Sequence, residues 1–140
     1  YFWRRWKSRL SASTNPTITP DLTPEQLAYK KLEALRVKGW LQIGRTQDHF
    51  FELSEIFRQY LENRYQFPAR EWTTEEISAH FKNFHKLSEN LKNKARAILT
   101  QTDRIKFAKA ELTEGQVEIK TIINFIREAC PPDPQLSSRS

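Results

Sequence analysis

Residues 46–65, TQDHFFELSEIFRQYLENRY, decide the fold. Apolar side chains recur along them at spacings of three and four: Phe50, Leu53, Phe57, Tyr60 and Leu61. Polar and charged side chains fill the other side: Glu52, Glu55, Arg58, Gln59 and Glu62. This period predicts an amphipathic α-helix. Phe51 and Ile56 widen its apolar stripe, so we expect the longest helix here, at the centre of the molecule with neighbours on more than one side.

Helix-start signals repeat on both sides of this stretch. Capping boxes, in which a threonine precedes a Glu or Gln by three positions, stand at 23–26, 73–76 and 113–116, and Ser88 is a further N-cap candidate. We expect helices from 23 to 39, from 73 towards 84, from 88 to 99 and from 113 to the prolines at 131 and 132. A short apolar turn at 40–44 should pack down, and a separate short turn that buries Ile105 and Phe107 should start at 102–103. The fold class is therefore all-α, a compact bundle of about five helices that could contain a helix-turn-helix-like arrangement.

The composition agrees with a folded helical domain. Of 140 residues, 38% are hydrophobic, 12% are aromatic and only 3 are glycine. This is too apolar for general disorder and too poor in glycine for a β-barrel or sandwich with many turns. Methionine is absent even at position 1, so we expect a piece of a longer protein. The single cysteine, Cys130, cannot form an internal disulfide, which fits a reducing compartment.

The strongest cationic character belongs to the first ten residues, YFWRRWKSRL. Four aromatic and four basic side chains are mixed there: Tyr1, Phe2, Trp3 and Trp6 with Arg4, Arg5, Lys7 and Arg9. This mixture is typical of the cytosolic edge of a membrane span, where rings lie among the headgroups and cations face anionic lipids. We therefore expect residues 1–10 to be a juxtamembrane segment that follows a span upstream of Tyr1. The alternatives are a short surface helix, aromatic side chains docked on the domain, and a nucleic-acid-binding arm.

The rest of the chain divides by composition into three parts. Residues 11–22, SASTNPTITPDL, are rich in Ser, Thr and Pro without apolar periodicity, which indicates a semi-extended linker. Residues 23–130 should form the helical cytosolic domain, in which acidic and basic residues are nearly balanced. Residues 131–140 begin with two prolines, and we expect them to be a flexible C-terminal tail.

The sequence carries no recognisable catalytic or metal-binding pattern. His80 and His85 would lie about 140° apart around a helix, so one helix cannot present both to a metal ion. There is no cysteine pair, HExxH motif or EF-hand loop, and the glycines are too isolated for a phosphate-binding loop. We therefore expect a non-catalytic protein without a metal or cofactor.

An aromatic segment beside a turn is the first candidate for a binding surface. Residues 65–72, YQFPAREW, place large apolar side chains next to a proline, where an exposed patch for a partner protein can form. The partner surface is predicted at five residues: Tyr65, Phe67, Pro68, Arg70 and Trp72. The alternative is that aromatic residues at this turn only cap the core.

Nucleic-acid binding by a helix-turn-helix module is the second hypothesis for function. Its recognition helix would be 74–84, but Glu75 and Glu76 would then repel the phosphate backbone. A basic run would supply the cationic contacts: Lys92, Lys94 and Arg96. A solvated helix face explains the same run, so we expect no nucleic acid as partner.

Residues 45–77 and 98–116 resemble parts of the C-terminal cytosolic region of BatD-type membrane proteins of the bacterial aerotolerance operons. The first stretch carries the resemblance in its spaced aromatic residues and the Pro-Ala step after them: Phe51, Leu53, Ser54, Arg58, Tyr60, Leu61, Arg64, Tyr65, Pro68, Ala69, Thr73, Glu75 and Glu76. The second carries it in a KFA turn: Asp103, Lys106, Phe107 and Ala108. The resemblance implies a periplasmic part, one membrane span and this helical domain on the cytosolic side of the inner membrane.

The same resemblance bears on function. Genes of such proteins commonly accompany those of a MoxR-type AAA+ ATPase and of von Willebrand A-domain proteins. It therefore implies a scaffold or adaptor that binds one of these, and it brings no catalytic residues. Arg58 and Arg64 could pair with Glu55 or Glu62, or contact a partner.

Overall fold

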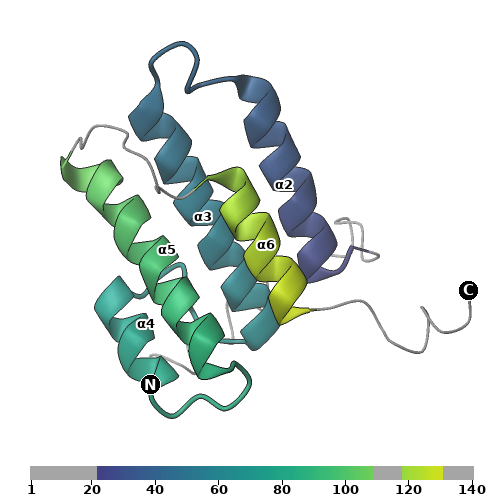
Figure 1. Ribbon diagram of the computed structural model, residues 1–140, viewed down its shortest axis with the longest axis vertical. Helices are drawn as coiled ribbons and strands as arrows, with labels where there is room; N and C mark the ends of the chain where they lie inside the picture. Colours follow the sequence, from purple (N-terminus) through teal and green to yellow (C-terminus); the bar gives the residue numbers. More distant parts are fainter. Residues whose placement is uncertain (1–21, 109–117, 131–140) are drawn as a thin grey trace, which may run out of the picture.

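Helix α3 (Thr46–Tyr65) lies at the centre of the computed structural model, which describes residues 22–108 and 118–130 (Figure 1). Helix α2 (Pro24–Lys38) packs on one side of α3, and α5 (Glu89–Ala108) packs on another. Helix α4 (Thr74–Phe81) contacts α5, and α6 (Ile119–Ala129) contacts α5 and α2. Over the described ranges there are five helices and no strand, so the predicted all-α bundle is confirmed.

The apolar stripe of α3 forms the middle of the core. Leu53, Phe57 and Leu61 are completely buried. The ring of Phe57 meets that of Phe125 from α6 edge to face, with centroids 5.2 Å apart. Helix α3 therefore has neighbours on several sides, as its widened stripe predicts.

Three helix starts carry the N-caps that the sequence indicates. The hydroxyls of Thr23 and Thr73 accept from the backbone N–H three residues on, and the side chains of Gln26 and Glu76 accept from the caps' own N–H groups. The hydroxyl of Ser88 accepts from the N–H of Leu91 at 3.2 Å. Each cap satisfies backbone donors that the first helical turn would otherwise leave without a partner.

The prediction of a separate turn at 102–103 was wrong. Helix α5 continues to Ala108, which makes it as long as α3 at 20 residues. The Thr102 hydroxyl donates to the carbonyl oxygens of Ile98 and Leu99, so it bonds inside the helix instead of capping a new one. Helix α4 is shorter than expected, because the chain tightens after Phe81 into turns with i to i+3 hydrogen bonds.

The turn between α2 and α3 packs down only in part. Gly39 ends α2 at φ 62°, and Trp40 rests against the core. Leu41 and Ile43 are exposed, so the prediction that 40–44 packs down was wrong for these two side chains.

Four predicted segments lie outside the described residues: 1–10, 11–21, 113–117 and 131–140. Within the ranges described, no helix is both long and apolar enough to cross a bilayer. Helix α6 begins at Ile119, where the Thr121 hydroxyl accepts from the N–H of Glu118 at 3.2 Å.

Candidate functional site

The predicted partner surface at 65–72 is largely buried, and for three residues the expected exposure was wrong. Phe67 is completely buried, Tyr65 is 5% exposed, and Pro68 is buried as well. Gln66 ends α3 in the left-handed conformation at φ 60°, which turns the chain so that Phe67 re-enters the core. There its ring lies 5.6 Å from that of Trp72 and 4.8 Å from that of His80.

The other two predicted residues remain accessible. Trp72 is half-buried, and Arg70 is exposed. The Arg70 Nε lies 2.5 Å from Oε1 of Glu55 on α3, and both side chains are about half exposed (46% and 47%). The loop 66–73 and α3 therefore present to solvent a charged pair beside a tryptophan edge, and the other aromatic ring of the loop, that of Phe67, faces inward.

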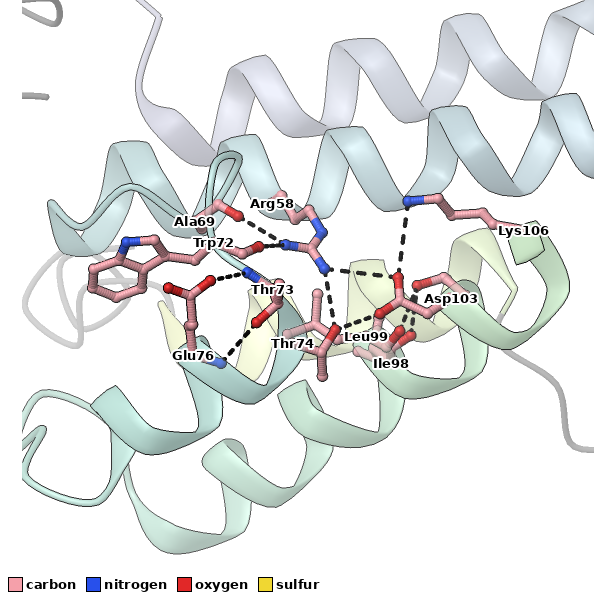
Figure 2. A network of polar contacts seen from close by, with 11 residues as sticks. Arg58, Ala69, Trp72, Thr73, Thr74, Glu76, Ile98, Leu99, Asp103 and Lys106 are labelled. Atoms are coloured by element: carbon pink, nitrogen blue, oxygen red, sulfur yellow. Dashed lines mark hydrogen bonds and ion pairs between the residues drawn. The ribbon is translucent and has the colours of Figure 1, made fainter. Parts of the chain in front are cut away.

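Beneath this pair lies a buried arginine that holds the loop in place (Figure 2). Arg58 comes from α3 and is 7% exposed. Its Nη1 donates to the carbonyl oxygens of Ala69, at 2.9 Å, and Trp72, at 2.5 Å. Its Nη2 donates to the hydroxyl of Thr74 at 3.1 Å. One guanidinium thus links the central helix to the middle and the C-terminal part of the loop and to the first residue of α4.

The same cluster extends to α5 through Asp103. The Thr74 hydroxyl donates to Oδ2 of Asp103 at 2.5 Å (Figure 2). Oδ1 of Asp103 lies 3.7 Å from Nη2 of Arg58 and 3.8 Å from Nζ of Lys106. Burial is the largest influence on Lys106 and lowers its pKa, while Asp103 acts against that shift. Three helices are therefore joined by one polar cluster.

A cleft of about 500 Å³ opens over this cluster. Its lining contains three carboxylates, three cations and three further residues: Glu55, Glu75 and Asp103; Arg58, Arg70 and Lys106; Trp72, Thr73 and Thr74. We call it the mixed-charge cleft. Since the charges of its walls balance, it suits a ligand that presents charges of both signs, such as a segment of another protein, better than a simple anion.

Arg58 and Arg64, for which pairing with Glu55 or Glu62 was one of two alternatives, have other partners. Arg58 pairs with Asp103 on another helix, and Arg64 pairs with Glu25 of α2 at 3.1 Å. Glu55 takes Arg70 as its partner, and Glu62 accepts from the backbone N–H of Arg70 at 3.2 Å. The i to i+4 rule indicates partners along one helix and gives no information on carboxylates brought in by the fold. The sequence marked Asp103 only as part of the expected turn at 102–103 and of the KFA turn, and not as a partner of Arg58.

The features expected of a nucleic-acid module are weak in the structure. The eight-residue connection 66–73 between α3 and α4 is much longer than the three to four residues of a helix-turn-helix. Lys92 is buried, Lys94 pairs with Glu128 at 2.9 Å, and Arg96 lies 5.6 Å over the ring of Phe81. The basic run is therefore divided among separate contacts.

Two of the three histidines, His49 and His80, pack as aromatic side chains, whereas His85 is exposed. His49 meets the Phe50 ring at 5.1 Å, and His80 lies among Phe67, Trp72 and Phe84. Burial lowers the pKa of both imidazoles. Across residues 22–108 and 118–130, no group of three or more His, Cys, Asp or Glu side chains is placed to hold a metal ion.

Comparison with known proteins identifies no relative: no family model, no curated protein and no solved structure matches the chain.

Proposed function

We propose that residues 23–130 form a non-catalytic protein-interaction domain, a scaffold or adaptor, of a single-span bacterial membrane protein. The domain would lie on the cytosolic side of the inner membrane. Its partner would be a MoxR-type AAA+ ATPase or a von Willebrand A-domain protein. The resemblance of 45–77 and 98–116 to BatD-type proteins supports this choice of partner.

The observation that carries the proposal is the mixed-charge cleft. Its rim holds the half-exposed pair Glu55–Arg70 and the exposed Glu75, next to the edge of Trp72. Arginine and tryptophan are enriched at the centres of protein interfaces, and paired opposite charges select a complementary partner. The two stretches that resemble BatD-type proteins also meet here, since Arg58 and Asp103 lie in the same cluster.

The support beneath the rim favours recognition by a preformed surface. Arg58 donates to the loop 66–73 at Ala69 and Trp72, and Thr74 ties the start of α4 to Asp103 on α5. A surface that is already ordered loses less conformational entropy when a partner binds. We therefore place the partner contact on this rim and no longer on the aromatic side chains of 65–68.

Reversal of the rim pair tests the proposal. Glu55→Arg combined with Arg70→Glu keeps an ion pair between the positions but exchanges the signs that a partner meets. We expect the tagged full-length protein carrying both substitutions to retain at most about a tenth of its partner in purifications from native membranes. Mass spectrometry of the retained proteins is the readout, and thermal unfolding checks that the variant folds.

A matched control exists on the other side of α5. Lys94 and Glu128 form an ion pair at 2.9 Å whose side chains are equally exposed, at 47% and 45%. Lys94→Glu combined with Glu128→Lys should leave partner recovery within about twofold of the original protein. If both exchanges recover the same amount of partner, the cleft is not part of the interface. If the original protein enriches no partner at all, the proposed function is contradicted.

A further inference from the structure

The loop between α2 and α3 forms a second exposed surface, distinct from the mixed-charge cleft. The last turn of α2 and the connection to α3, residues 36–45, RVKGWLQIGR, lie at one end of the bundle and are called the α2–α3 tip (Figure 1). Val37 is 70% exposed, Ile43 is 68% exposed and Leu41 is 37% exposed. Three large exposed aliphatic side chains thus lie within seven residues, and an exposed apolar group of this kind can mark an interaction site.

The tip is held in one shape by its own contacts. Trp40 packs partly against the core, and its carbonyl accepts from the N–H of Arg45 at 2.8 Å. Gly39 and Gly44 have φ values of 62° and 81°, which side chains with a Cβ rarely adopt. The aliphatic side chains of the tip are therefore presented by an ordered loop.

Cations surround these side chains. Three basic residues, Arg36, Lys38 and Arg45, lie between positions 34 and 47, and that stretch contains no Asp or Glu. The Lys38 ammonium lies 4.5 Å from the centre of the Trp40 ring, and the Arg45 guanidinium lies 5.1 Å from it. All three cations are exposed, so they can reach a ligand beyond the tip.

Two carboxylates lie just behind the tip. Glu33 bonds Arg36 through a two-pronged contact, and Asp48 bonds Arg45 at 2.8 Å. Both carboxylates lie one helical turn further from the loop than their arginines. The outermost charges are therefore basic, and the acidic partners do not interrupt the apolar residues.

We infer that the α2–α3 tip contacts the surface of an anionic lipid bilayer. Aliphatic side chains on a convex loop enter the boundary between headgroups and acyl chains, a tryptophan lies at headgroup level, and Lys and Arg meet lipid phosphates. A flat apolar face with charges of both signs would fit a protein partner better. The contact does not depend on the partner proposed for the cleft, and it would orient that cleft relative to the membrane.

An environment-sensitive fluorophore tests this contact in the full chain. The label is attached at Ile43→Cys in a Cys130→Ser background, and the chain is mixed with vesicles of phosphatidylcholine with or without phosphatidylglycerol. We expect a blue shift and quenching by spin-labelled lipid only when phosphatidylglycerol is present. A label at Asn90→Cys, exposed at the start of α5 on the opposite end of the bundle, should keep the emission of an aqueous probe.

Loss of the aliphatic side chains should weaken binding. Val37→Ser combined with Ile43→Ser should lower the vesicle partition coefficient roughly tenfold, because less apolar surface leaves water. Leu22→Ser, just before the start of α2 and thus at the other end of that helix from the tip, serves as the control and should change the coefficient less than about twofold. Both tip side chains are mostly in solvent, so the variant should fold.

Three results would overturn the inference. One is a label at position 43 that stays in water while the chain sediments with vesicles. Another is a partition coefficient that the tip substitutions leave unchanged. The third is loss of a co-purified protein by the tip variant with vesicle binding intact, which would assign the tip to a protein partner. None of these depends on the exchange of Glu55 and Arg70, so the two proposals fail separately.

Discussion

Arg58 is the residue on which the local architecture depends most. Its guanidinium supplies donors to two loop carbonyl oxygens and to Thr74, and it faces Asp103. Buried carbonyl groups that lose a donor keep the cost of their desolvation. The sequence marks Arg58 as a polar residue on the less apolar side of a helix, but its burial comes from the loop that closes over it.

Replacement of Arg58 should destabilise the whole domain. Arg58→Met keeps the length of the side chain but leaves the carbonyl groups of Ala69 and Trp72 without their donor, and it removes the cation that faces Asp103, which keeps the hydrogen bond from Thr74. We expect the free energy of unfolding in urea to fall by about 3 kcal/mol.

The exposed Arg104 on α5 provides the control, since Arg104→Met should change that free energy by less than about 0.5 kcal/mol. In a double-mutant cycle, Asp103→Asn should cost less in the Arg58→Met background than in the original protein. Strict additivity of the two losses would show that the pair is not coupled.

Two histidines, the buried His49 and the partly buried His80, make stability depend on pH. Burial lowers the pKa of His49 and His80 from the usual value of 6.5, so the unfolded chain binds these protons at a higher pH than the folded chain does. The part of the free energy of unfolding that depends on these neutral imidazoles is therefore fully present above pH 6.5, and it is lost as the pH falls below that value. Urea unfolding at a series of pH values between neutral and about pH 5, above the range where carboxylates titrate, measures the decrease.

Removal of both imidazoles gives the corresponding check. His49→Gln combined with His80→Gln should lower stability at neutral pH, because packing against the aromatic rings is lost. The free energy of unfolding should then change less steeply with pH between pH 6.5 and 5. His85→Gln, at an exposed position, should leave that slope unchanged. A slope that persists in the double variant would assign the pH dependence to other groups.

At the scale of elements, features set by neighbouring residues could be predicted from the sequence, and features set by contacts between distant residues could not. The starts of α2, α4 and α5 could be predicted because a cap is defined by residues three positions apart. The continuation of α5 past Thr102 could not, because a threonine hydroxyl can cap a new helix or bond within an existing one. The burial of Phe67 depends on the turn at Gln66, where a non-glycine residue with positive φ gives no sequence signal.

The N-cap of α4 makes a measurable contribution to the stability of the domain. Thr73→Ala removes the hydroxyl that accepts from the N–H of Glu76 and disrupts the reciprocal contact. We expect a loss of about 1 kcal/mol in the free energy of unfolding, measured by urea denaturation. Thr100→Ala, at an exposed position inside α5, should be neutral or slightly stabilising because alanine has the higher helix propensity. Equal effects at both positions would mean that the cap contributes nothing specific.

At the scale of the whole molecule, the central place of α3 followed from its wide apolar stripe, and the bundle class followed from the number of capped segments. The candidate site could be predicted only in part. Arg70 and Trp72 were chosen correctly as accessible residues, but the cleft that they border also needs Asp103 and Lys106 from a helix more than thirty positions away. Such a juxtaposition is a property of the packed bundle, and no spacing along the chain encodes it.

The most direct test of the interaction proposal is site-specific photocrosslinking in living cells. A photoreactive amino acid at Glu75, on the rim of the mixed-charge cleft, should form a covalent adduct with a MoxR-type ATPase or a von Willebrand A-domain protein. The same amino acid at Glu128, on α6, should form none. Identical adducts from both positions, or no adduct from Glu75, would contradict the assignment of this cleft as the partner-binding surface.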